Sequence, residues 1–183
     1  MMSSMVRTLR LAGVLGAMTG AALFVASCAS TPDDSKEPRL VVESADFPSF
    51  SAGVDSVFER RCASLDCHGT TARGLRLYSA NGLRLANDVG NAPGVGPTTA
   101  AEINANYAAI VGLQPEKMNQ LLAKSPRTAD DAYQLLILSK PLGLERHKGG
   151  NALSKGEPAE QCIETWLTTK ADQALCAKGS ALP

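Results

Sequence analysis

Residues 62–68 of the 183-residue chain read CASLDCH, so two cysteines with four residues between them are followed at once by a histidine. This is the densest group of reactive side chains in a sequence that holds only five cysteines and two histidines. Upstream of it, apolar side chains recur at the i, i+3, i+4 spacing of a helix face. The pattern predicts a short helix over residues 50–61, with Ser51 as N-cap, that ends directly at Cys62.

Two thiols followed by a histidine are the arrangement for covalent attachment of haem, in which Cys62 and Cys67 form thioethers and His68 ligates the iron. The common form has two residues between the cysteines, whereas this chain has four. The vinyl groups of haem are a fixed distance apart, so the longer spacer must bulge. Two other interpretations stay open. One is a local disulfide between the two cysteines, and the other is a zinc site formed with His68 and His147.

Iron in such a site needs a second axial ligand or an open position. His147 is the first candidate, because it lies in a loop that continues with two glycines. Met118 is the alternative, since many single-haem proteins use a thioether, and two histidines give a lower potential than histidine with methionine. The competing interpretations are a solvated loop residue for His147 and a core side chain in a short helix for Met118.

The surroundings of the motif resemble cytochrome c over roughly residues 47–170. The resemblance rests on the helix that leads into Cys62, on Gly69, on His147 before a glycine pair, and on a closing helix around Trp166. It implies one covalent haem c, with Cys62 and Cys67 as thioethers, His68 as the proximal ligand and His147 as the distal ligand. Trp166 is expected in the core.

Composition favours helices and loops over sheet, because alanine, leucine and glycine dominate and β-branched runs are few. The fold class that we expect is mainly α: a small cytochrome-c-like domain of four to five short helices with long loops. Apolar periodicity and capping signals place these helices over residues 50–61, 100–111, 115–123, 130–138 and 158–167. Two alternating pieces, residues 75–77 and 83–85, are either a small hairpin or two extended loop segments.

The N-terminus has the three parts of a secretory signal: basic Arg7 and Arg10, an uncharged apolar run, and small residues before Cys28. The residues Val-Ala-Ser-Cys that end the run resemble the lipobox of bacterial lipoproteins, in which the cysteine is acylated. We therefore expect a signal peptide at residues 1–27, a lipidated Cys28 on a flexible stalk over 28–46, and a cytochrome-c-like domain over 47–183. The resemblance implies an exported protein, sorted to the outer membrane and facing the periplasm.

The last two cysteines, Cys162 and Cys176, have no histidine neighbour and are expected to form a structural disulfide. After removal of the signal the net charge is near −2, which gives no reason to expect nucleic-acid binding. Five arginines near the motif are expected to form a solvated face, with haem propionates or an acidic partner as the alternative contact: Arg60, Arg61, Arg73, Arg76 and Arg84.

No nucleophile–base set, phosphate loop or paired-carboxylate signature is recognisable, so the chain is not expected to be an enzyme. The function that the motifs predict is electron transfer by a membrane-tethered periplasmic c-type cytochrome-like protein, with a redox protein as possible partner. The alternative is a haem-free, disulfide-stabilised binding or structural lipoprotein of the cell envelope.

Overall fold

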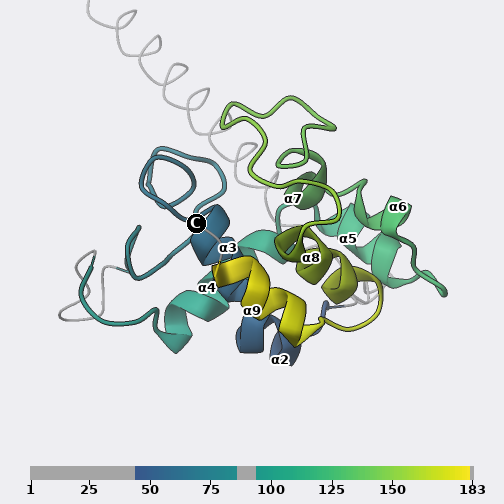
Figure 1. The fold of residues 1–183 in the computed structure, drawn as a ribbon, viewed down its shortest axis with the longest axis horizontal. Coiled ribbons are helices and arrows are strands. Elements are labelled where there is room, and N and C mark those ends of the chain that lie inside the picture. Colours follow the sequence, from purple (N-terminus) through teal and green to yellow (C-terminus); the bar gives the residue numbers. More distant parts are fainter. Residues whose placement is uncertain (1–43, 86–93, 182–183) are drawn as a thin grey trace, which may run out of the picture. The chain divides into compact units, whose positions relative to one another are not determined.

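The computed structural model describes residues 44–85 and 94–181, and these residues are mainly helical, as the sequence predicts (Figure 1). The expected signal peptide, Cys28 and the stalk up to residue 43 lie outside the described residues. Within the described ranges, no helix combines the length and the apolar character needed to cross a bilayer.

The first helical run has three consecutive segments: α2 (Phe47–Ser49), the π-helical η2 (Phe50–Val54) and α3 (Asp55–Arg61). It begins three residues before the expected start, because the side chain of Asp46, not that of Ser51, caps it by accepting from the backbone of Ser49. The expectation for Ser51 is therefore wrong. Residues 44–46 also pack on the domain: Ala45 is buried, and the carbonyl of Asp46 accepts from the indole of Trp166 at 2.9 Å.

The middle of the chain forms four short helices: α4 (Ala100–Val111), α5 (Pro115–Leu122), α6 (Ala129–Ala132) and α7 (Leu136–Ser139). The expected single helix over 130–138 is split into α6 and α7. Leu135 between them is extended, because the next backbone N–H is donated to the side chain of Gln114 at 2.7 Å. Thr128 caps α6, because its side chain accepts from the backbone N–H of Asp131.

The chain closes with α8 (Pro158–Thr168) and α9 (Gln173–Ala181), which pack against each other (Figure 1). In addition, α9 packs against α3, and α8 packs against η2. The expected disulfide between Cys162 and Cys176 joins them, with the two Cα atoms 4.8 Å apart. The helix α9 was not expected from the sequence. At Gly179 a Cβ would lie 2.5 Å from the Cα of Ala159, so only glycine allows this close approach of α8 and α9.

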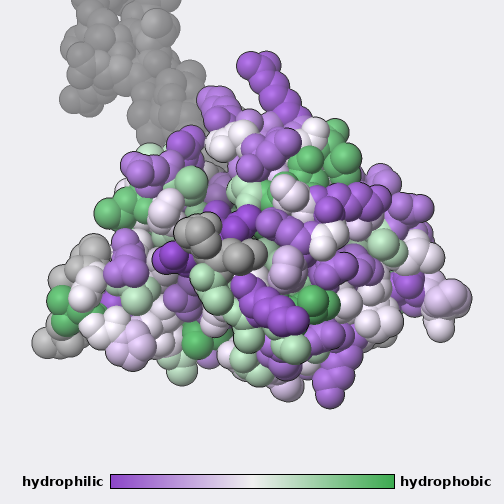
Figure 2. All heavy atoms as spheres, in the orientation of Figure 1, coloured by the Kyte–Doolittle hydropathy of each residue, from purple (hydrophilic) through white to green (hydrophobic). Residues whose placement is uncertain are grey.

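The hydrophobic core lies between the first helical run, α4 and α8. Phe50 is fully buried, and its ring centre lies 5.3 Å from those of both Tyr107 and Trp166, which confirms the core position expected for the tryptophan. The two alternating pieces form no hairpin: one isolated bridge joins Tyr78, just after the first piece, to Leu83 in the second, so the pieces are extended loop segments. The face in Figure 2 is mostly polar with scattered apolar residues.

Candidate functional site

The cysteine-motif loop, residues 62–69, folds into a compact turn at the end of α3. The backbone N–H of Cys67 donates to the carbonyl of Ser64 at 3.0 Å, and the N–H of His68 donates to the carbonyl of Cys62 at 2.9 Å. These bonds return the chain to the end of α3 after the four-residue spacer. The spacer therefore bulges, as the sequence analysis expects.

A close approach of the backbone fixes this loop against the following segment. The carbonyl of Ala63 accepts a hydrogen bond from the hydroxyl of Ser79 at 3.0 Å. A Cβ would lie 2.1 Å from that carbonyl oxygen at Gly69 and 2.2 Å from it at Gly82, so neither position tolerates a side chain. The sequence marks Gly69 next to the motif and Gly82 between the two alternating pieces, but a local pattern does not show that Gly82 faces the motif loop.

Cys62 and Cys67 are both half-buried free thiols in the structure. Burial first, and then the neighbouring Cys67, raises the pKa of the Cys62 thiol to about 12, against the opposing effect of Arg61. The structure does not adopt the local disulfide that the sequence left open.

Each of the two histidines has one ring nitrogen tied to a backbone carbonyl. Nδ1 of His68 lies 3.0 Å from the carbonyl oxygen of Leu75, and Nδ1 of His147 lies 2.8 Å from that of Gly150. A carbonyl only accepts, so Nδ1 carries the hydrogen and Nε2 of the neutral ring keeps its lone pair. Burial, the largest effect, lowers the pKa of His68 and favours this neutral form. It is the tautomer that metal-ligating histidines use.

The structure brings His68 and His147 together, although 79 positions separate them in the sequence. Their ring centres are 6.1 Å apart, and the ring planes differ by only 7°. With metal–nitrogen bonds of about 2.0–2.1 Å, two imidazoles on opposite sides of one ion have ring centres about 6 Å apart. The observed distance between the ring centres is close to that value, and the two rings are stacked nearly parallel.

The connection between α7 and α8, residues 140–157, carries His147. Its base is closed by a bond from the N–H of Leu153 to the carbonyl of Pro141 at 3.1 Å. Arg61, the last residue of α3, donates to the carbonyl of Ala152 and to the carboxylate of Glu157. The connection is therefore joined directly to the helix that ends at Cys62.

Met118, the alternative ligand, is 2% exposed and lies in α5. It lines a small apolar space together with Ile110, Leu113, Gln114, Leu135 and Ile137. This is the core position that competed with the ligand interpretation. The expected zinc alternative is not assembled either: within residues 44–85 and 94–181, no three histidine, cysteine or acidic side chains group as metal ligands.

A cavity of about 320 Å³ lies beside α3, between the cysteine-motif loop and the segment around Ser79. Its lining is mostly polar: Ser56, Glu59, Arg60, Ala63, Ser64, Ser79, Ala80, Asn81 and Ser180. The lining includes neither His68 nor His147. This cavity is therefore separate from the histidine pair.

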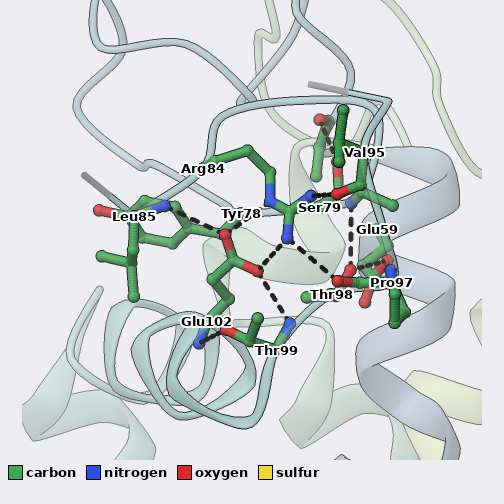
Figure 3. A network of polar contacts seen from close by, with 12 residues as sticks. Glu59, Tyr78, Ser79, Arg84, Leu85, Val95, Pro97, Thr98, Thr99 and Glu102 are labelled. Atoms are coloured by element: carbon green, nitrogen blue, oxygen red, sulfur yellow. Dashed lines mark hydrogen bonds and ion pairs between the residues drawn. The ribbon is translucent and has the colours of Figure 1, made fainter. Parts of the chain in front are cut away.

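A buried ion pair supports the segment behind the motif loop (Figure 3). Arg84 donates to Glu102 through Nε at 2.8 Å and Nη2 at 3.1 Å, and their side chains are 2% and 0% exposed. Arg84 also donates to the carbonyls of Val95 and Pro97. The expectation of a solvated arginine face is therefore wrong for Arg84, which is buried because α4 presents an acidic residue to it. It is also wrong for Arg61, whose side chain is 15% exposed.

No family model, curated protein or solved structure that was compared with the chain matches it. The interpretation of the site therefore depends on the cysteine–histidine motif and on the geometry of the two imidazoles.

Proposed function

We propose that this chain is an exported c-type cytochrome-like electron-transfer protein that binds one haem and is tethered by lipid on Cys28 to the outer membrane, facing the periplasm. The observation that carries the proposal is the His68–His147 pair, with ring centres 6.1 Å apart and planes within 7°. Each ring donates from Nδ1 to a backbone carbonyl, which leaves both Nε2 atoms as ligands.

Four side chains would hold a covalent haem. The S–H of Cys62 and that of Cys67 would each add across a vinyl double bond, with the sulfur and the hydrogen going to its two carbons, so no external oxidant is needed. His68 would be the proximal ligand and His147 the distal ligand. When bound, haem supplies a one-electron couple between ferric and ferrous iron. The two neutral imidazoles favour a lower potential than histidine with methionine would.

The ligand set favours electron transfer over catalysis. Two histidines on opposite sides of the iron leave no coordination position for a substrate. No acid, base or nucleophile is then required from the chain, and the natural partner is a second redox protein of the envelope. A net charge near −2 for the mature chain gives nucleic acid no role in this proposal.

The test is made on the full chain, expressed in a host that carries a c-type haem-attachment system. Trypsin cleaves after Arg61 and Arg73, so one peptide, residues 62–73, contains both thiols and His68. We expect this peptide to gain roughly 600 Da, and the intact protein to give a thioether-haem band in a pyridine haemochrome spectrum.

Three variants assign the ligands. His147→Ala should open the sixth position and leave haem attached, whereas Met118→Leu, the matched control, should leave the six-coordinate spectrum unchanged. A Cys62→Ser/Cys67→Ser double variant should carry no covalent haem. A wild-type peptide that lacks the added mass would reject the proposal. Loss of two hydrogens from it would favour the haem-free, disulfide-stabilised binding or structural lipoprotein instead.

A further inference from the structure

We propose that Arg61 is a positioning residue for the distal ligand: it holds the segment that carries His147 so that the imidazole lies opposite His68. The inference rests on the proposed function, because it concerns the second axial ligand of the same iron.

The geometry of Arg61 connects the two halves of the site. It is the last residue of α3, directly before Cys62, and its Nη2 donates to the carbonyl of Ala152 at 3.0 Å and to Oε1 of Glu157 at 2.8 Å. The side chains of Arg61 and Glu157 are only 15% and 19% exposed. Solvent therefore screens this pair less than it screens an ordinary surface ion pair.

Glu157 is itself held in place. It is the N-cap residue of α8, and the same Oε1 accepts from the backbone N–H of Ser154 at 3.0 Å. One carboxylate oxygen thus joins the end of α3, the end of the His147 segment and the start of α8. Movement of that segment away from Cys62 would break both bonds of the guanidinium.

The segment around His147 has little packing of its own. Residues 143–146 and 148–151 are all exposed, and Gly150 has a φ of 73°, which glycine adopts without strain. A segment with few buried contacts opens locally at low free-energy cost unless polar bonds restrain it. Polar bonds therefore set the position of the distal imidazole. The two bonds from Arg61 connect the His147 segment to the helix that ends at Cys62.

The test compares Arg61→Met, which removes both hydrogen bonds at similar side-chain length, with Arg61→Lys, which keeps a positive charge and N–H donors at the end of the side chain. Lys124→Ala is the control, because it deletes an ion pair with Asp131 in which the lysine is 51% exposed, away from the site. In the holoprotein we expect wild type, Arg61→Lys and Lys124→Ala to stay six-coordinate. Arg61→Met should gain a five-coordinate high-spin fraction and bind carbon monoxide in the ferrous state.

A second readout needs no haem. In chain purified without the attachment system, amide hydrogen exchange of residues 145–153 should be about tenfold faster in Arg61→Met than in Lys124→Ala, because a charge-assisted hydrogen bond is lost. A six-coordinate Arg61→Met holoprotein, or exchange in Arg61→Met no faster than in Lys124→Ala, would overturn the positioning role. A wild-type chain without haem would instead reject the proposed function, and the two failures are therefore distinguishable.

Discussion

Replacing Glu102 by glutamine should destabilise the domain strongly. The carboxylate of Glu102 is fully buried and accepts from the guanidinium of Arg84 and from the backbone N–H groups of Leu85 and Thr99. Burial opposes its ionisation, but these hydrogen bonds together with the Arg84 charge outweigh burial and hold the pKa of Glu102 below its ordinary value. The side chain is therefore ionised at neutral pH.

The magnitude follows from what the variant leaves behind. The amide of glutamine is neutral, and its NH₂ group cannot accept from Arg84, so a guanidinium with a side chain only 2% exposed loses its counter-charge. Breaking a buried pair from one side costs about 3–5 kcal/mol. Small domains have about 5–15 kcal/mol of stability in total, so the change is a large fraction of it.

Urea unfolding at pH 7, followed by circular dichroism, measures this difference. Lys124→Ala removes an ion pair with Asp131 in which the lysine is 51% exposed, and it should lower the free energy of unfolding far less than Glu102→Gln does. The stabilising effect of the Glu102 carboxylate should disappear as the pH falls through its lowered pKa, since the unfolded chain takes up the proton first. A Glu102→Gln variant as stable as Lys124→Ala would refute the reasoning.

Two further predictions concern stability. Replacing Cys162 and Cys176 together by serine should lower the free energy of unfolding by about 3 kcal/mol, because the disulfide closes a loop with a sequence separation of 14. Reductant should therefore lower the urea midpoint of the wild-type protein, and an unchanged midpoint would contradict this prediction. Burial, the largest effect, raises the pKa of Asp55 from 3.8 to about 8, so the folded state binds a proton more firmly than the unfolded state does. The contribution of Asp55 to stability is fully present below about pH 4 and is lost as the pH rises towards 8. Urea titrations at several pH values measure this decrease in the free energy of unfolding, and Asp55→Asn should make it smaller. The same pH dependence in wild type and in the variant would count against a buried neutral acid.

The parts of the fold that local sequence determines were predicted well. The helix α4 begins at Ala100, behind a capping box of Thr99 and Glu102, and α8 begins at Pro158, both as expected. The helix α9 has only a weak apolar pattern in its sequence. It is held in place by the disulfide and by the close contact that Gly179 allows. Interactions between distant segments of this kind leave no periodic signal in the sequence.

In the candidate site, too, local sequence predicts some features, and contacts between distant segments determine the others. The motif itself indicates Cys62, Cys67 and His68, and the resemblance to cytochrome c indicates His147. What the sequence does not contain is the hydrogen bond from each Nδ1 to a carbonyl, since any residue supplies that oxygen. The role of Arg61 was missed for a related reason: its two acceptors lie 91 and 96 positions further along the chain.

The four-residue spacer is the main departure from the common attachment motif, and the fold accommodates it on the solvent side. Ser64, Leu65 and Asp66 are all exposed, and the chain closes behind them through the bond from the N–H of His68 to the carbonyl of Cys62. The additional residues thus project outward as a turn instead of separating the cysteine-bearing ends of the loop. Cys62 and His68 are thus joined by a backbone hydrogen bond despite the longer spacer.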